Sequence, residues 1–305
     1  MNTMHFKYAV EVERTRSITQ AAENLYMAQP NLSKAIKELE DTLGITIFER
    51  TPKGVIPTVK GAEFLEYAKN VLVQIDRMEQ LYIPEDETRQ RFRISIPRGS
   101  YIANAFTRFV AELDADKQID VGVQETNSMQ TIANVSEGQF ELGIIRYQTD
   151  YENYFLDYLE EKRLQFEPIW EFEYLALMSR QHPLAKADKV PYEALSEYIE
   201  IVHGDTAIPY LPAERVQRTD GGKRIFVYER CSQFDMLSHI HNTYMWVSPI
   251  PDRFLKLYGL VQRKCHAANH KYKDLLISQK GYVFTALDRK FINELYTSKN
   301  EVAFR

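Results

Sequence analysis

The sequence feature that most constrains the fold is the stretch AQPNLSKAIKELE, residues 28–40. Leu32, Ile36 and Leu39 recur there at the spacing of one helix face, and the polar side chains lie largely off that face. Pro30 suits the first turn of a helix, because a residue in that turn needs no helical partner for its missing N–H. The stretch therefore predicts a helix with one buried side and one polar side.

Two more helices are predicted before this one. Ser17 and Gln20 have the spacing of a capping box at the start of SITQAAENL, and the small residues that follow permit close packing. Residues 4–14 have the apolar spacing of a supporting helix, and Gly44 is placed to end the third helix. Two short helices joined by a tight turn, behind a supporting helix, predict a helix-turn-helix.

A small hairpin is predicted next. Residues 45–59, ITIFERTPKGVIPTV, contain two apolar, β-branched runs around the turn-forming sequence TPKG. The hairpin would form a wing beside the third helix. Arg50 and Lys53 lie near its tip, where cations would contact a DNA backbone.

A long helix is predicted from Thr58 to about Tyr82. Its apolar positions alternate in steps of three and four for three heptads, as in the seam of a coiled coil: Gly61, Phe64, Ala68, Val71, Ile75, Met78 and Tyr82. Such a seam would form a dimer and place two third helices on two DNA half-sites. The alternative is a long helix that lies on its own domain. Residues 83–91 are polar, contain a proline and predict a hinge.

Beyond the hinge, strands and helices alternate. FRISIP (92–97), IDVGVQE (119–125) and FELGII (140–145) are predicted strands, with helical sequences between them. This order implies a parallel, three-layer α/β sheet with right-handed crossovers. Later segments predict a second α/β lobe. YKDLLISQ and DRKFINELYTS, near the end, predict one more strand and one more helix.

Composition narrows the class of protein. The 305 residues are 44% hydrophobic and 27% charged, which is ordinary for a globular chain of two or three domains. No stretch approaches the roughly 20 apolar residues that cross a bilayer, and no signal peptide is evident, so we expect a cytoplasmic protein with no membrane partner. Two cysteines argue against a disulfide framework. Residues 1–60 carry a net charge of only +1 in a chain of −5, so DNA binding there would depend on a few placed charges.

Residues 17–65 resemble the N-terminal domain of LysR-type transcriptional regulators. The shared features are small residues in the second helix, Gln-Pro at the start of the third, then LE, LG, FER and a late T-x-x-G. The rest of the chain is similar in layout, including HPLA at 182–185. The resemblance implies an all-α winged helix-turn-helix and a long linker helix. A C-terminal α/β effector domain of two Rossmann-like lobes would follow, similar to periplasmic solute-binding proteins.

The predicted domains follow from this layout. They are the DNA-binding domain at 1–58, the linker helix and hinge at 59–90, effector lobe I at 91–164 and 266–305, and effector lobe II at 165–265. The resemblance implies a transcriptional regulator, not an enzyme, whose DNA binding is modulated by a small anionic effector and which needs no cofactor. The expected partners are double-stranded promoter or operator DNA, the effector, RNA polymerase, and further copies of the chain in a homodimer or homotetramer.

The resemblance also assigns DNA-contacting residues. Gln29, Ser33 and Lys34 are expected to approach base edges and backbone in the major groove, because Gln can pair with adenine and Lys can reach guanine acceptors or phosphate. Many family members have Arg where Lys34 stands, which weakens a bidentate reading of guanine. The other expected DNA contacts are Ser17, Thr19, Asn31, Lys37, Arg50, Thr51 and Lys53. The expected dimer contacts are Phe64, Ala68, Val71, Ile75 and Met78.

An effector site is expected beyond the carboxyl ends of the parallel strands, where loops and helix N-termini converge. Arg98 and Arg146 in two of these loops favour an anionic small molecule. The alternative is that both arginines form surface ion pairs. The expected contacts are Arg98, Gly99, Ser100, Tyr101, Thr126, Asn127, Ser128, Arg146, Tyr147, His203 and Ser248. The sequence departs from the family at NTYMWVSPIP, residues 242–251, where Tyr244 and Trp246 replace small residues and alter the usual shape of the cleft.

Three alternatives remain open at this point. An enzyme is disfavoured, because no nucleophile elbow, P-loop, dinucleotide fingerprint or metal-ligand spacing occurs; His239 and His241 are two apart in a predicted helix and do not face together. A cytoplasmic solute-binding protein would leave residues 1–82 unexplained. A redox-sensing regulator would act through Cys231 and Cys265, although ordinary reduced thiols are the simpler interpretation.

Overall fold

The computed structural model describes residues 2–52, 54–82, 89–204, 223–228, 233–265 and 271–303. The chain divides into two compact units, Met1–Glu87 and Thr88–Arg305, and each is described by itself. Within the described ranges, no helix combines the length and the apolar composition that crossing a bilayer requires. Most of the predicted hinge lies outside these ranges, and its last residues begin a strand.

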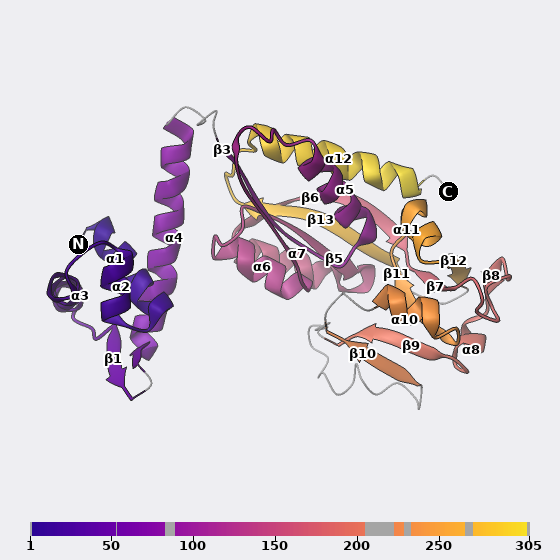
Figure 1. Cartoon of the computed structure of the whole chain (residues 1–305), viewed down its shortest axis with the longest axis horizontal. Coiled ribbons are helices and arrows are strands. Elements are labelled where there is room, and N and C mark those ends of the chain that lie inside the picture. Colours follow the sequence, from indigo (N-terminus) through magenta and orange to yellow (C-terminus); the bar gives the residue numbers. More distant parts are fainter. Residues whose placement is uncertain are drawn as a thin grey trace. The chain divides into compact units, whose positions relative to one another are not determined.

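In its described residues, the first unit is helical apart from one hairpin (Figure 1). Its elements are α1 (Thr3–Thr15), α2 (Ile18–Asn24), α3 (Gln29–Leu43), β1 (Phe48–Thr51), β2 (Gly54–Pro57) and α4 (Val59–Tyr82). The two strands are antiparallel, with Arg50 opposite Val55. The predicted helix-turn-helix, wing and long helix are confirmed.

Local signals account for the ends of α2 and α3. The Ser17 hydroxyl accepts a hydrogen bond from the Gln20 N–H and caps α2. Only this half of the predicted capping box forms, because the Ser17 N–H donates to the Thr15 hydroxyl instead of to Gln20. The Gln20 side-chain amide donates to Glu23 and Asn24. Gly44 ends α3 with φ 67°, a left-handed conformation that favours glycine.

The apolar stripe of α3 forms much of the core of the first unit. Leu32 and Leu39 are completely buried, and Ala21 and Ala22 of α2 are small enough for the helices to approach closely. The other buried members of this core are Phe6, Ala9, Val12, Ile36, Ile47, Val55, Leu65 and Ala68. Burial of the stripe leaves the polar side of α3 facing outward.

The long helix α4 changes its role along its length. Its first turns pack on the unit: a side chain at Gly61 would meet the Ile47 carbonyl oxygen at 2.0 Å, and Ala68 is buried. Further along, Val71 and Met78 are 40% and 54% exposed. The predicted seam is therefore split, since its first half is occupied by the helix's own unit and its second half is open.

The described residues of the second unit form two sheets (Figure 1). The first has the order β4-β3-β5-β13-β6. Its strands are β3 (Arg89–Ile96), β4 (Gln118–Glu125), β5 (Leu142–Gln148), β6 (Leu164–Glu173) and β13 (Lys271–Gln279). The first three are parallel, as predicted, whereas β13 runs antiparallel between β5 and β6, so the sheet is mixed.

Helices cover both faces of this first sheet. One face carries α5 (Ser100–Ala111) and α12 (Ala286–Ala303), and the other carries α6 (Ser128–Ser136) and α7 (Glu152–Glu161), which follows the short helix η1 (Thr149–Tyr151) (Figure 1). Phe109 and Phe291 belong to the buried core of the first face, and Ile132 and Leu159 to that of the second. This is the three-layer arrangement that the alternating pattern predicts.

The second sheet has the order β10-β9-β11-β7-β12-β8. Its strands are β7 (Leu175–Ser179), β8 (Lys189–Val190), β9 (Ile199–His203), β10 (Arg224–Val227), β11 (Thr243–Val247) and β12 (Leu260–Cys265). The accompanying helices are α8 (Tyr192–Leu195), α10 (Gln233–His239) and α11 (Asp252–Leu257). The fold is thus a helical winged helix-turn-helix, a linker helix and two mixed α/β lobes.

The chain crosses from the first sheet to the second at Tyr174, the single residue between β6 and β7. The sequence assigned residues from 165 onward to the second lobe, but β6 pairs with β13 along its whole length and lies in the first sheet. The crossing is one extended stretch without glycine, so no turn signal marked it.

Candidate functional site

The polar side of α3 is the first candidate site. Asn31, Lys34 and Lys37 are exposed, and Gln29 and Ser33 are half-buried in the first two turns. Lys34 lies 3.8 Å from Glu38, an exposed pair one helical turn away that restrains the lysine weakly. The helix therefore presents amide, hydroxyl and ammonium groups at its N-terminal end, where a recognition helix contacts base edges.

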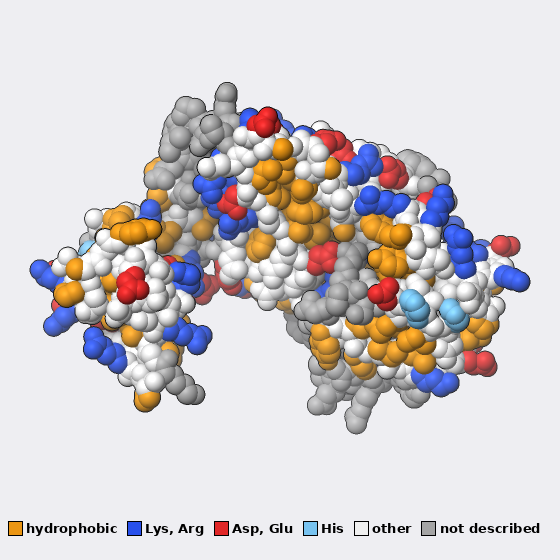
Figure 2. Space-filling view, viewed as in Figure 1, with side chains coloured by type: hydrophobic (Ala, Val, Ile, Leu, Met, Phe, Trp, Pro, Cys, Tyr) orange, Lys and Arg blue, Asp and Glu red, His pale blue; other side chains and the backbone are white. Residues whose placement is uncertain are grey.

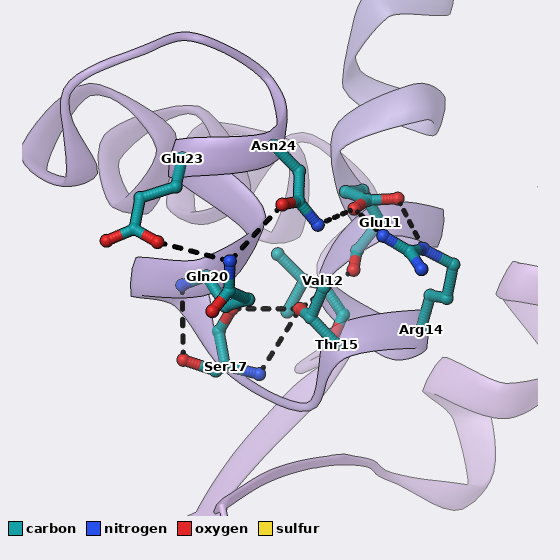
Figure 3. A network of polar contacts seen from close by, with 8 residues as sticks. All are labelled: Glu11, Val12, Arg14, Thr15, Ser17, Gln20, Glu23 and Asn24. Atoms are coloured by element: carbon teal, nitrogen blue, oxygen red, sulfur yellow. Dashed lines mark hydrogen bonds and ion pairs between the residues drawn. The ribbon is translucent and has the colours of Figure 1, made fainter.

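A polar network fixes the start of α2 against α1 (Figure 3). The Thr15 hydroxyl accepts the Ser17 N–H, and Asn24 donates to the Glu11 carboxylate at 2.7 Å. Glu11 also pairs with Arg14 at 2.6 Å, and this guanidinium holds the pKa of Glu11 below its usual value. Ser17 thus caps its helix, while Thr19 is exposed beside it.

The wing is braced at its base. One Glu40 carboxylate oxygen accepts the N–H groups of Ile47 at 2.6 Å and Phe48 at 3.1 Å. On the other strand, the Val55 N–H donates to the Arg16 carbonyl at 2.9 Å. The wing is therefore tied both to α3 and to the turn between α1 and α2.

Two of the three predicted wing contacts lie in the described part of the chain. Arg50 is exposed, and the Thr51 hydroxyl donates to the Gly54 carbonyl at 3.0 Å; Lys53 lies outside the described ranges. In the face that Figure 2 presents, Lys and Arg side chains are spread around this unit rather than gathered in one patch. This spread of charge agrees with the expectation that DNA binding by this unit would depend on a few placed cations and not on a basic patch.

The second candidate site is a cavity of about 280 Å³ in the second unit. Strand ends and loops of both sheets line it, which is where ligands bind in α/β folds. Seven predicted contacts line it: Arg98, Thr126, Asn127, Ser128, Arg146, Tyr147 and His203. Gly99, Ser100, Tyr101 and Ser248 do not line it, and all four are buried.

Arg146 is the centre of a buried cluster at this cavity. Its side chain is 6% exposed and donates to both carboxylate oxygens of Asp274, each at 2.7 Å. It also donates to the Ser248 hydroxyl at 3.1 Å, and Tyr101 donates to Asp274. Burial alone would lower the pKa of Arg146, but Asp274 outweighs it and raises that pKa well above its usual value.

This cluster also explains Gly99. A side chain there would meet the Arg146 guanidinium at 2.9 Å, so glycine lets the loop lie close to the arginine. Ser248 belongs to the connection after β11 of the second sheet, whereas Arg146 and Asp274 belong to the first. The arginine therefore bonds the two lobes to each other.

Sequence reasoning missed the ring-bearing wall of the cavity. Tyr151, Phe155, Tyr174 and Tyr272 line it, together with Trp246, which was noted only as a departure from the family. Tyr174 directly follows β6, and Tyr272 is the second residue of β13, 98 residues later in sequence. Only the pairing of β13 with β6 brings them together, so no local signal could have found them.

The remaining alternatives receive no support from the site geometry. Cys265 is partly buried, and Cys231 lies outside the described ranges. Among the described residues, no group of three or more His, Cys, Asp or Glu side chains could hold a metal ion.

Comparisons with known proteins match both units of the chain. The model of the bacterial regulatory helix-turn-helix protein, lysR family, matches residues 4–62, and that of the LysR substrate binding domain matches residues 83–262. The uncharacterized HTH-type transcriptional regulator YnfL of Escherichia coli (strain K12) is 27% identical over 198 residues, 63% of this chain and 62% of that protein. The HTH-type transcriptional regulator AlsR of Bacillus subtilis (strain 168) is 22% identical over 266 residues, 85% of this chain and 83% of AlsR.

A solved structure extends the comparison to the whole fold. Full-length CbnR complexed with its target DNA matches with a TM-score of 0.58 at 14% identity, over 98% of this chain and 100% of CbnR. At this identity the likeness establishes the fold alone. The two family models together span the helix-turn-helix and most of the two-lobed unit, so the chain belongs to the LysR family: it is a DNA-binding transcriptional regulator with an effector-binding domain, not an enzyme.

Proposed function

We propose that this chain is a cytoplasmic regulator that binds promoter or operator DNA as a homodimer or larger homo-oligomer, and that a small anionic effector in the cavity alters this binding. The observation that carries the proposal is the composition of the cavity wall. Asn127 and Ser128 come from the first lobe, and His203 and Trp246 from the second. A molecule held by both lobes binds some lobe arrangements better than others, and only such a difference in affinity can shift a conformational equilibrium.

The anionic class is supported by the start of α6. Asn127 caps this helix by accepting the Gln130 N–H, and both Asn127 and Ser128 line the cavity. A helix N-terminus carries a partial positive charge and favours carboxylates and phosphates. Arg98 also lines the cavity, and its guanidinium donates to the Tyr228 carbonyl of the second lobe.

DNA reading is assigned to the polar side of α3. Gln29, Ser33 and Lys34 lie in its first two turns, with Asn31 and Lys37 beside them, and Arg50 extends the surface at the wing. The solved complex of CbnR with its target DNA supports a DNA-bound form of this fold. In this proposal Gln29 and Ser33 contribute sequence preference, whereas the lysines and Arg50 contribute backbone attraction.

Footprinting on the DNA just upstream of the protein's own coding sequence, near physiological salt, tests the proposal. Gln29→Ala and Ser33→Ala should each weaken binding to the protected site about tenfold or more while leaving non-specific binding nearly unchanged. Thr42→Ala, at the other end of the same helix, is the matched control and should change neither. Equal losses on specific and unrelated DNA would contradict base reading by α3.

A further inference from the structure

We propose that the effector of this chain carries a flat aromatic ring together with its carboxylate, and that the cavity selects the ring. The inference rests on the proposed function, because it names the class of molecule that the same cavity would take. It stands on the aromatic wall of the cavity and on the pairing of Arg146.

The cavity wall contains aromatic rings from four parts of the second unit. Tyr147 stacks on Phe155 with ring centroids 4.9 Å apart, and Tyr174 stacks on Tyr272 with centroids 3.7 Å apart. All four rings line the cavity, as do Tyr151 and Trp246. A flat ring can pack against such walls with stacked or edge-to-face contacts, which a saturated ring of the same size cannot make as well.

The charges that line the cavity are largely committed elsewhere. Arg146, which the sequence offered as an anion receptor, makes its two shortest bonds to Asp274. Glu200 pairs with Arg224 at 3.0 Å. Because these charges already have partners, a ligand gains less from ion pairing here, and more of its affinity must come from ring contacts and neutral hydrogen bonds.

The tyrosine hydroxyls are suited to that second role. The Tyr147 hydroxyl already donates to the Glu152 carboxylate at 3.3 Å, but burial raises the pKa of Tyr174 and Tyr272, so these two hydroxyls keep their protons near neutral pH and can donate them. A ligand with its carboxylate near the start of α6 could accept hydrogen bonds there, while its ring packs against the aromatic side chains of the wall. The size also fits: a protein cavity of about 150 Å³ can hold benzene, and this one has about 280 Å³.

Matched pairs of carboxylates isolate the ring from the charge. Benzoate, phenylacetate and 3-phenylpropionate are compared by calorimetry on the full chain with cyclohexanecarboxylate, cyclohexylacetate and 3-cyclohexylpropionate. In at least one pair the aromatic member should bind about tenfold more tightly, the gain expected from ring contacts on two walls. No preference in any pair, or no binding at all, would overturn the inference. Benzyl alcohol or benzylamine binding as tightly as benzoate would overturn its carboxylate part.

Variants locate the ring preference. Trp246→Leu keeps an apolar side chain but removes one ring from the wall, and should reduce the aromatic-to-saturated affinity ratio about threefold or more. Phe166→Leu, on β6 and outside the cavity wall, is the matched control and should keep the ratio. The unfolding midpoint of each variant checks that it is folded. Trp246→Tyr retains a ring and should keep most of the preference for the aromatic carboxylate.

The same molecules separate this inference from the proposed function. Aromatic carboxylates that bind but leave the DNA footprint unchanged would keep the ring inference and contradict effector control of DNA binding. Aliphatic carboxylates that bind as well as aromatic ones and alter the footprint would support effector control of DNA binding and contradict the ring inference.

Discussion

His182 is buried in the second lobe, with 3% of its surface exposed. Its Nδ1 accepts the Leu184 N–H at 3.1 Å, and its ring centroid lies 4.4 Å from that of Tyr198. Burial lowers its pKa from 6.5 to about 4. The folded state thus binds a proton less readily than the unfolded state, so the neutral ring stabilises the fold above pH 6.5 and this contribution is lost as the pH falls from 6.5 toward 4.

Unfolding in urea, followed by tryptophan fluorescence, measures this contribution. Trp170 and Trp246 both lie in the second unit and therefore report on it. The free energy of unfolding should fall by up to roughly 3 kcal/mol between pH 7 and pH 4 through this residue. His182→Asn retains an acceptor for the Leu184 N–H but does not titrate, so its stability should fall less over this range. Parallel pH profiles for the two proteins would contradict the assignment.

Single residues also show where sequence reasoning ends. Ser17 and Gly44 were predictable, because each acts on its own helix within a few residues. Arg146 lines the cavity, but its partner Asp274 follows 128 residues later, on a strand inserted between β5 and β6. Its charge environment could not be derived without that topology.

At the scale of elements, the wing shows how a short hairpin gains a fixed position. A two-stranded hairpin is marginally stable by itself. Here the Glu40 carboxylate holds one strand to α3, and the Arg16 carbonyl holds the other to the turn after α1. The position of the wing beside α3 is therefore set by backbone hydrogen bonds to the helical part of the unit.

Replacement of Glu40 should loosen the wing. Glu40→Ala leaves the Ile47 and Phe48 N–H groups without their acceptor, a loss of about 1–3 kcal/mol for buried donors. Hydrogen exchange of the peptide covering residues 45–52 should become about tenfold faster or more. Glu40→Gln keeps an oxygen acceptor and should remain close to the original rate. Glu38→Ala, which removes an exposed carboxylate two residues earlier on the same helix, should also do so. Equal exchange in all four proteins would show that other contacts hold the wing.

Elements with strong local signals were the predictable ones. The helices of the first unit and the strands β3, β4 and β5 follow from periodicity, caps and turn residues. The point where the chain enters the second sheet could not be predicted from such signals, because Tyr174 joins two strands without any break in extended backbone. The aromatic cavity wall depends on that crossing, so most of it was missed as well.

At the scale of the whole molecule, the open part of α4 offers a surface for self-association. Tyr67, Val71, Gln74 and Met78 follow one another at coiled-coil spacing and line an apolar groove with Asn70 and Ile75. The proposed dimer contacts therefore shift from Phe64 and Ala68, which pack within the unit, toward this groove.

A charge in this groove should break the dimer. Val71→Glu places a carboxylate in the groove, where it would lose water on association, so the mass in solution should fall to that of one chain at micromolar concentration. Val59→Glu makes the same change on the same helix at a residue that is 90% exposed, and should leave the mass unchanged. Light scattering measures both, and an unchanged mass for Val71→Glu would contradict dimerisation through this groove.

The strand order of the first sheet has a consequence for synthesis in the cell. β13 lies between β5 and β6 but ends at Gln279, whereas the first unit is complete by Glu87. During translation the DNA-reading unit can fold early, while the sheet that lines the cavity must wait for its inner strand. At about 5–20 residues per second the interval lasts roughly 10–40 s. For that time each nascent chain carries a folded DNA-binding unit and no completed sensor, so chaperones that shield unpaired strands are needed most by its second unit.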